Sequence, residues 1–442
     1  MRWSPQAVAA ATGGQTEGTA DEILDGVAID SRQLQPGALF VAIRAERDGH
    51  DWINAAIAAG AAGLLVERGR RGVHTSSPVI EVADTAAALL ALGAAARDRL
   101  AATVIGVTGS VGKTSTKDLA AAALGAGVRT TASEKSFNNE LGVPLTLANA
   151  PLDAGAAVIE MGARGPGHIA RLCQVARPTI GVVTAVVAAH TEVFGDLDSV
   201  AAAKAELVEA LPAEGTAILN ADDGRVLAMA DRTGAASVTY SAGGAPNVDV
   251  AAEDVQLDEE LRPRFVVRSA WGVVTVQLGA RGVHQVGNAL AALAVAGCCG
   301  VPMEAAAAAL AAPPLSPWRM ELGYSPAGAV ILNDAYNANP ASMAAALQAL
   351  AALPATRRIA VLGEMAELGE RRTDEHHQIV QLAARLGVEV VVVSTDAYGM
   401  RPLAGIDAAI EELGPLGRGD AVLVKASRVA ALERLAARLV AG

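Results

Sequence analysis

The chain has 442 residues, a formal net charge of −12 and 3% aromatic residues. This length predicts two or three domains, and the acidity argues against a nucleic-acid-binding surface. Residues 1–14 lack the apolar stretch of a signal peptide, and the uncharged run at residues 286–303 is interrupted by glycines and a proline. Neither segment predicts a membrane span. We therefore expect a cytoplasmic protein, and we predict that it is a monomer.

Cysteine and lysine are both scarce in this chain. The cysteines are Cys173, Cys298 and Cys299, which offer neither a disulfide framework nor the spacing of zinc ligands. Five of the thirty-five basic residues are lysines. Because arginine does not lose its proton and is a rigid fork, the remaining lysines are enriched at positions that need an amine. These positions are Lys113, Lys117, Lys135, Lys204 and Lys425.

The first hundred residues predict a small α/β domain. Strands are expected at residues 27–32, 38–43, 63–67 and 78–82, and helices at 52–59 and 84–99. Two polar loops accompany these elements, DSR at residues 30–32 and DGHD at 48–51. Taken alone, such loops are typical of solvated turns.

Residues 101–314 predict a second domain, which contains the strongest motif. An apolar strand at 104–107 leads through a glycine-rich turn to Lys113, which opens a helix. In this geometry backbone N–H groups and a helix N-terminus surround a polyphosphate, and the lysine adds a mobile charge. The next hydroxyl, Thr114, can bind Mg²⁺. Five residues separate Gly106 from Gly112 where the strict pattern has four, which indicates a particular branch of P-loop enzymes.

Strands and helices continue to alternate along the rest of this domain. Strands at 157–162, 179–183 and 217–219 predict a mostly parallel sheet. A smaller antiparallel portion is expected near residues 248–250, 265–268 and 273–278, followed by helices at 288–296 and 304–311.

A proline-rich linker at residues 313–317 precedes a third region. Four strand–helix units follow it, with strands at 329–333, 358–362, 389–393 and 421–424. This recurrence predicts a Rossmann-like domain at residues 315–442. No G-x-G-x-x-G follows its first strand, which argues against a dinucleotide site.

Several polar residues follow strands, where open α/β sheets bind ligands. Glu160 and His190, together with Thr114, are ligands suited to Mg²⁺. Arg319, just beyond the linker, could reach a terminal phosphate. The stretch DAYNAN that begins at Asp334 offers a carboxylate and amides to a ribose or base. This distribution predicts a cleft that closes between two domains.

These segments resemble the Mur ligase family along nearly the whole chain. The most specific pieces are FNNELGVPLTL at residues 137–147, DAYNANPASM at 334–343 and GEMAELG at 363–369. The resemblance implies three domains: residues 1–100 bind a UDP-linked substrate, 101–314 bind ATP, and 315–442 receive a dipeptide. It implies an α/β fold, with a small N-terminal α/β domain, a central P-loop ATPase with a mostly parallel sheet, and a C-terminal Rossmann-like domain.

The implied activity belongs to peptidoglycan precursor synthesis. ATP phosphorylates the carboxylate of a UDP-N-acetylmuramoyl-tripeptide, and the amine of D-alanyl-D-alanine then displaces phosphate. The resemblance also implies two Mg²⁺ ions. Thr114 and Glu160 would hold one ion, and His190 and a carbamylated Lys204 would serve the second. The sequence leaves open whether the third residue of the tripeptide is lysine or diaminopimelate.

The resemblance assigns further roles residue by residue. Lys113 would hold the β- and γ-phosphates, Arg319 would contact the γ-phosphate, and Asn288 and Asp334 would contact the nucleoside end. The full ATP-binding set is Gly109, Ser110, Gly112, Lys113, Thr114, Ser115, Asn288, Arg319, Asp334 and Asn337. The set for the UDP-linked substrate is Asp30, Ser31, Arg32, Asp48, His50, Asn138 and Asn139. Ser115 and Gln285 stand where the family usually has a threonine and an asparagine.

Lys204 has a physical argument of its own. A metal ion beside an acyl phosphate prefers anionic oxygen ligands, and an ammonium would repel it. A neutral amine can add CO₂ and become a carbamate, which carries a negative charge. Arginine cannot do so, and this chain otherwise strongly prefers arginine. We therefore predict that Lys204 is carbamylated in the working enzyme.

Two kinds of alternative stay open at this point. A related ligase could add an amino acid to another UDP-muramoyl peptide, or glutamate to a folate. A P-loop switch is a different class, but it would require a guanine-reading N-K-x-D motif, which this sequence lacks.

Overall fold

The computed structural model describes residues 1–16, 23–70, 77–187 and 194–442. The chain forms two compact units, each of which is described by itself. The first comprises Met1–Gly106, Val128–Gly162 and His168–Ile180; the second comprises Val107–Gly127, Ala163–Gly167 and Gly181–Gly442. The boundary between them falls within β8 (Thr103–Thr108) and within β11 (Ile180–Val183). None of the helices in the described parts of the chain has the length and apolar character that a membrane span requires.

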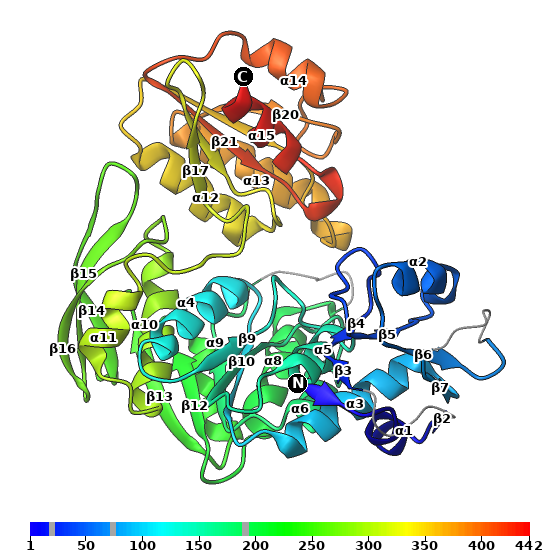
Figure 1. Cartoon of the computed structure of the whole chain (residues 1–442). Coiled ribbons are helices and arrows are strands. Elements are labelled where there is room, and N and C mark those ends of the chain that lie inside the picture. Colours follow the sequence, from blue (N-terminus) through cyan, green and yellow to red (C-terminus); the bar gives the residue numbers. More distant parts are fainter. Residues whose placement is uncertain (17–22, 71–76, 188–193) are drawn as a thin grey trace. The chain divides into compact units, whose positions relative to one another are not determined.

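A five-stranded sheet organises the N-terminal part of the first unit (Figure 1). Its order is β2-β7-β6-β5-β4; the β2–β7 pair is antiparallel and the other pairs are parallel. Phe40, Leu64 and Val66 form its core with Ile53 and Ala56. The elements are β1 (Arg2–Trp3), α1 (Pro5–Thr12), β2 (Gln15–Thr16), β3 (Leu24–Asp25), β4 (Val27–Ala28), β5 (Leu39–Val41), η1 (Gly49–Trp52), α2 (Ile53–Ala58), β6 (Gly63–Glu67), β7 (Val79–Val82) and α3 (Thr85–Arg99).

The first unit also contains β9 (Thr130–Ala132) and β10 (Ala156–Glu160), which pair in parallel, with α5 (Gly142–Asn149) and α6 (His168–Ala176). Helix α3 lies so close to α5 that a Cβ on Gly93 would overlap Pro144. Asn149, at the end of α5, accepts a hydrogen bond from the Val27 N–H at 2.8 Å and donates one to the Val27 carbonyl at 2.9 Å. These bonds attach the helix to β4.

The second unit carries the glycine-rich loop and an extended sheet. Helix α4 (Lys113–Gly125) follows the loop, and the sheet continues through β11, β12, β13, β14, β15 and β16, in that order. The β12–β13–β14 pairs are parallel, and β14–β15–β16 form the expected antiparallel portion. The elements are α8 (Leu197–Glu209), β12 (Thr216–Asn220), α9 (Gly224–Leu227), η2 (Ala228–Arg232), β13 (Ala236–Ser241), β14 (Val250–Leu257), β15 (Pro263–Ser269), β16 (Gly272–Gln277), α10 (Gln285–Cys298) and α11 (Met303–Ala309).

The C-terminal sheet of the second unit is covered on both faces (Figure 1). Its order is β17-β18-β21-β19-β20, with β17 antiparallel and the other strands parallel. Neighbouring residues alternate between two cores: Leu332 and Leu423 face one, Ile331 and Val422 the other. The elements are β17 (Glu321–Tyr324), β18 (Val330–Asn333), α12 (Pro340–Ala352), β19 (Arg357–Leu362), η3 (Gly369–Arg371), α13 (Arg372–Arg385), β20 (Glu389–Val392), α14 (Ile406–Leu413), β21 (Asp420–Lys425), η4 (Arg428–Ala430) and α15 (Glu433–Ala441). The four expected strand–helix units are therefore present.

The structure differs from the sequence expectations at a few elements. The strand expected at residues 27–32 is reduced to β4, because residues 30–32 turn and Asp30 bonds to Arg32. The strand expected near residues 248–250 is β14, which begins at Val250 and runs to Leu257. Strands β1, β2, β3, β9, β13 and β17 are additional.

Candidate functional sites

The glycine-rich loop is shaped by close backbone approaches. Gly109 has a φ of +146° and Gly112 a φ of +81°. A Cβ on Gly109 would overlap the Thr184 hydroxyl, and one on Gly112 would lie 2.6 Å from Asn288 Oδ1. Both positions therefore require glycine. The Lys113 ammonium lies over the loop, where it donates to the carbonyls of Gly109 at 2.7 Å and Ser110 at 3.3 Å.

Thr184, at the end of β11, holds the loop from the side. Its buried hydroxyl donates to the Val111 carbonyl at 2.5 Å, and the Ser110 N–H donates to the Ala185 carbonyl at 2.7 Å. The Ser110 hydroxyl in turn accepts a bond from the Val187 N–H at 3.2 Å. Sequence reasoning missed Thr184, although a polar residue at the end of an apolar strand was a usable indication.

The start of α10 meets the start of α4. Asn288 accepts a hydrogen bond from the Thr116 hydroxyl at 3.1 Å and donates to Gln285 at 2.8 Å. Gln285 then reaches the Ser115 hydroxyl at 3.5 Å. Ser115 and Gln285, which both differ from the residues expected in the family, thus contact each other, and the longer amide reaches the smaller hydroxyl side chain.

Arg319 also reaches the phosphate loop. Its Nη2 donates to the Thr114 hydroxyl at 2.8 Å, and its guanidinium lies 4.3 Å from the centre of the Tyr336 ring. Its Nε is buried and has no hydrogen-bond partner within the described parts of the chain. An arginine with a buried, unused donor beside a phosphate loop is suited to an anion. These contacts bring the residues together as one candidate ATP site. It consists of the loop glycines, Lys113, Thr114, Ser115, Asn288 and Arg319.

Asp334 belongs to a buried ion pair that the sequence did not predict. The Lys425 ammonium lies 2.5 Å from the Asp334 carboxylate, 2.9 Å from the Asn337 carbonyl and 3.4 Å from the Asp334 carbonyl. Only 2% of the Lys425 side chain is exposed. The other Asp334 oxygen accepts a bond from the Met320 N–H at 3.1 Å. Asn339 caps α12, so its amide serves the helix.

Lys204, in α8, is buried, with 2% of the residue exposed. Burial, and secondarily the charge of Lys113, lowers the pKa of Lys204 to about 7. Its ammonium lies 5.9 Å from the centre of the Phe194 ring. Such a lysine is partly neutral at physiological pH. His190 lies outside the described residues.

Glu160 and Asn138 lie together in the first unit. Asn138 donates to Glu160 Oε1 at 2.7 Å, while Oε2 is buried and has no hydrogen-bond partner among the residues described. A buried carboxylate oxygen that accepts no hydrogen bond from the described residues is suited to binding a cation. Asn139 instead accepts bonds from the Leu141 and Gly142 N–H groups and so shapes the start of α5.

A cavity of about 590 Å³ lies in the first unit, between β4, the loops of the N-terminal sheet and α5. Asp30, Ser31 and Arg32 line it as one wall. Arg32 forms a two-point contact with Asp30, at 2.9 and 2.7 Å, which holds the pKa of that carboxyl below its usual range. Other lining residues include Phe40, Arg47, Trp52, Phe137 and Asn149.

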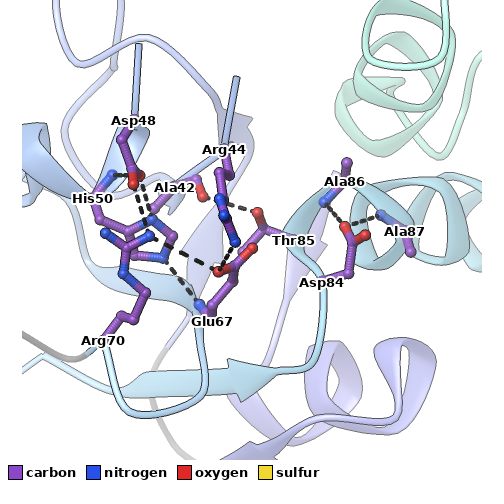
Figure 2. Close-up of polar contacts among 10 residues, drawn as sticks. All are labelled: Ala42, Arg44, Asp48, His50, Glu67, Arg70, Asp84, Thr85, Ala86 and Ala87. Carbon is purple, nitrogen blue, oxygen red and sulfur yellow. Dashed lines mark hydrogen bonds and ion pairs between the residues drawn. The ribbon is translucent and has the colours of Figure 1, made fainter. Parts of the chain in front are cut away.

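Asp48 and His50, also predicted to bind the UDP-linked substrate, are engaged with each other. His50 Nδ1 lies 2.7 Å from Asp48 Oδ1 (Figure 2). A backbone bond from the His50 N–H, followed by bonds from the His50 ring and Arg70, holds the pKa of Asp48 well below its usual range. The sequence predicted no role for Arg47 or Arg70 and no partner for Lys425. Arg70 pairs with Asp48 and Lys425 with Asp334, and both partners lie far away in the sequence.

The second unit is thus a P-loop nucleotide-binding α/β unit. The chain belongs to the Mur ligase family. Residues 24–99 match the model described as Mur ligase family, catalytic domain; residues 107–296 match the Mur ligase middle domain; and residues 318–442 match the Mur ligase, glutamate ligase domain.

Relatives are similar along nearly the whole chain. The UDP-N-acetylmuramoyl-tripeptide–D-alanyl-D-alanine ligase of Mycobacterium tuberculosis is 43% identical over 94% of this chain and 92% of its own. The protein of the same name from Escherichia coli is 37% identical over 96% and 95%. Crystal structure I of MurF from Acinetobacter baumannii has a TM-score of 0.87 at 28% identity, covering 100% of this chain and 99% of that chain.

A further solved structure supports the same likeness. The MurF ligase of Thermotoga maritima in complex with ADP has a TM-score of 0.80 at 28% identity, covering 93% of this chain and 96% of that chain. These likenesses confirm the expected three-part α/β fold class. The boundaries expected near residues 100 and 314 stay a prediction.

Proposed function

We propose that the chain is an ATP-dependent ligase that joins D-alanyl-D-alanine to a UDP-N-acetylmuramoyl-tripeptide. The observation that carries this proposal is the similarity to relatives of that name over 94% and 96% of the chain. The reaction takes place in the cytoplasm as part of peptidoglycan precursor synthesis, on which cell shape and division depend. The protein acts as a monomer.

The chemistry begins with a carboxylate, which is a poor electrophile. ATP transfers its γ-phosphoryl group to the tripeptide carboxylate, and the resulting acyl phosphate is attacked by the dipeptide amine. A tetrahedral intermediate then expels phosphate and leaves a peptide bond. The protein contributes mainly positioning and charge neutralisation.

The phosphate loop and its partners supply the positive charge. Lys113 exchanges its contacts with the Gly109 and Ser110 carbonyls for β- and γ-phosphate oxygens. Arg319 brings an unused Nε donor to the γ-phosphate, and its stacking on Tyr336 fixes the plane of the guanidinium. Asn288 and Asp334 contact the nucleoside end.

Two Mg²⁺ ions complete the proposed site. Thr114 and Glu160 would hold one ion, a role suited to the buried Glu160 oxygen that has no hydrogen-bond partner among the described residues. His190 and carbamylated Lys204 would serve the second. When bound, Mg²⁺ neutralises charge on the transferring phosphoryl group. Lys204 becomes a carbamate when its neutral amine adds CO₂ and releases a proton.

ADP release with a panel of substrates tests this function. We expect turnover only when a UDP-N-acetylmuramoyl-tripeptide and D-alanyl-D-alanine are both present with ATP and Mg²⁺. Tripeptides that end in lysine or diaminopimelate are compared side by side, which also identifies the accepted third residue. Equal turnover with a UDP-muramoyl dipeptide and a single amino acid, or with a folate and glutamate, would contradict the proposal.

A further inference from the structure

The cavity in the first unit contains two arginines in different electrostatic states. Arg32 is neutralised by its two-point contact with Asp30. Arg47 also lines the cavity, but it has no ion pair or hydrogen bond with any residue in the described ranges. Arg47 is therefore the arginine that can offer an uncompensated charge to a ligand there.

We infer that Arg47 binds the diphosphate of the UDP-linked substrate, and that Asp48 and His50 position it rather than touching the substrate. This inference rests on the proposed function, since that function supplies the diphosphate. A planar guanidinium presents paired N–H donors that match phosphate oxygens, and such charge-assisted bonds are stronger than neutral ones.

Arg47 lies on a short loop with fixed ends. Arg44 and Asp48 form an isolated antiparallel bridge, and the Gly49 N–H donates to the Ile43 carbonyl at 2.8 Å. A Cβ on Gly49 would lie 2.7 Å from the Ile43 nitrogen. The backbone segments at Ile43 and Gly49 are therefore too close together for a side chain at position 49. Residues 43–44 and 48–49 thus close the base of the loop, and residues 45–47 form the part that projects from it.

A polar cluster of Asp48, His50, Glu67 and Arg70 fastens that base to the sheet (Figure 2). Asp48 accepts bonds from the His50 backbone N–H at 3.0 Å and from Arg70 at 2.7 Å, in addition to its contact with the His50 ring. His50 Nε2 accepts a bond from the Glu67 N–H, at the end of β6, at 3.0 Å. Because Nε2 accepts a hydrogen bond, Nδ1 carries the ring proton and donates a hydrogen bond to Asp48.

The position of this cluster explains why its members act indirectly. Ala45, Arg47 and Gly49 are the members of residues 44–50 that line the cavity. The His50 side chain is 4% exposed and both of its ring nitrogens are already bonded. Asp48 and His50 therefore influence a ligand through the loop that carries Arg47.

Calorimetric binding of UDP and uridine separates the diphosphate from the rest of the ligand. We expect Arg47→Gln to weaken UDP binding roughly 10- to 100-fold, as for loss of a charge-assisted hydrogen bond, and to leave uridine binding unchanged. Arg44→Gln is the matched control. It removes the same charge from the same loop, but Arg44 is exposed and pairs with Glu67 at 3.6 Å, so UDP binding should stay near wild type.

Three outcomes would overturn the inference. Unchanged UDP affinity in Arg47→Gln would remove the contact, and an equal loss for UDP and uridine would show that Arg47 serves the loop and not the diphosphate. Either result leaves the proposed function intact if the wild-type enzyme turns over its substrates. A wild-type protein that binds neither UDP nor uridine would overturn the inference and the proposed function together.

A double-variant cycle tests the positioning role. His50→Ala should weaken UDP binding in the wild-type background but have little further effect in Arg47→Gln, because the residue acts through Arg47. His50→Gln, whose amide keeps a donor and an acceptor, should recover part of the affinity. Equal losses in both backgrounds, with thermal unfolding unchanged, would contradict positioning.

Discussion

The Arg319 guanidinium donates a 2.8 Å hydrogen bond to the Thr114 hydroxyl, 205 residues earlier in the chain. Thr114 is also the residue that the phosphate loop would present to Mg²⁺. A cation on this oxygen would repel the guanidinium, so Arg319 is expected to leave Thr114 when metal and nucleotide bind. The γ-phosphate is the proposed new partner, since the buried Arg319 Nε has no other partner among the described residues.

Arg319→Lys should therefore lower kcat by about 100-fold or more, the usual effect of losing a donor to developing charge. An ammonium keeps the charge but cannot stack on Tyr336 or present two donors. Steady-state ADP release is the measurement, and Arg262→Lys is the control because that exposed arginine pairs with Asp258 away from the loop. A kcat within a few-fold of wild type would exclude a role on the γ-phosphate.

Lys113→Ala should abolish turnover and leave the melting temperature nearly unchanged. The side chain is half-buried and bonds to two carbonyls of its own loop, so its removal creates little cavity. Binding of an ATP analogue should weaken in parallel. Near-normal turnover with an unchanged melting temperature would refute the assignment of the loop.

Lys204 should control the response to CO₂. Its lowered pKa, about 7 against 10.5 for an ordinary lysine, makes the neutral amine available as pH rises through about 7. Activation by bicarbonate should increase over that interval. Because the unfolded chain binds more protons between these values, the contribution of Lys204 to the free energy of unfolding should also rise with pH there. Below pH 7 Lys204 is charged in the folded state as well, so the free-energy cost of burying its ammonium is fully present there.

Two variants and one spectrum test this lysine. Lys204→Arg should be severely impaired, while Lys204→Ala should recover partly with added short-chain carboxylic acids. A carbamate signal from ¹³CO₂ should be present in the wild-type NMR spectrum and absent from both variants. Full activity of the arginine variant would end the carbamate proposal.

Lys425→Met should destabilise the second unit by about 3–5 kcal/mol, because it leaves the Asp334 carboxylate without its buried cation. The double variant Lys425→Met/Asp334→Asn should recover much of this loss. Denaturant unfolding measures both. Arg428→Gln is the control, since this half-exposed arginine pairs with Glu433 and should cost about 1 kcal/mol or less. An equally stable Lys425→Met protein would show that the ion pair contributes little.

The elements that sequence predicted well are those with local patterns. Strand β6 has the expected bounds, Gly63–Glu67, because a continuous apolar run between turns defines it. Strands β13 and β17 were missed because polar residues interrupt their patterns and their pairing depends on distant neighbours. The phosphate loop could be found from its glycines. The roles of Arg47 and Lys425 could not, since their surroundings are created only by folding.

Arg319 stands between two residues in left-handed backbone conformation, Trp318 with a φ of +59° and Met320 with a φ of +53°. Each costs roughly 1 kcal/mol or more in a residue with a side chain. The segment that carries the proposed γ-phosphate contact therefore has a strained backbone. A rearrangement that relaxes the backbone of Trp318 or Met320 also moves Arg319. Trp318→Gly would relieve part of this strain, and nucleotide binding and movement of the segment should be less tightly coupled in that variant. Met320→Gly would also relieve strain, but it would remove a buried side chain from the core of the C-terminal sheet.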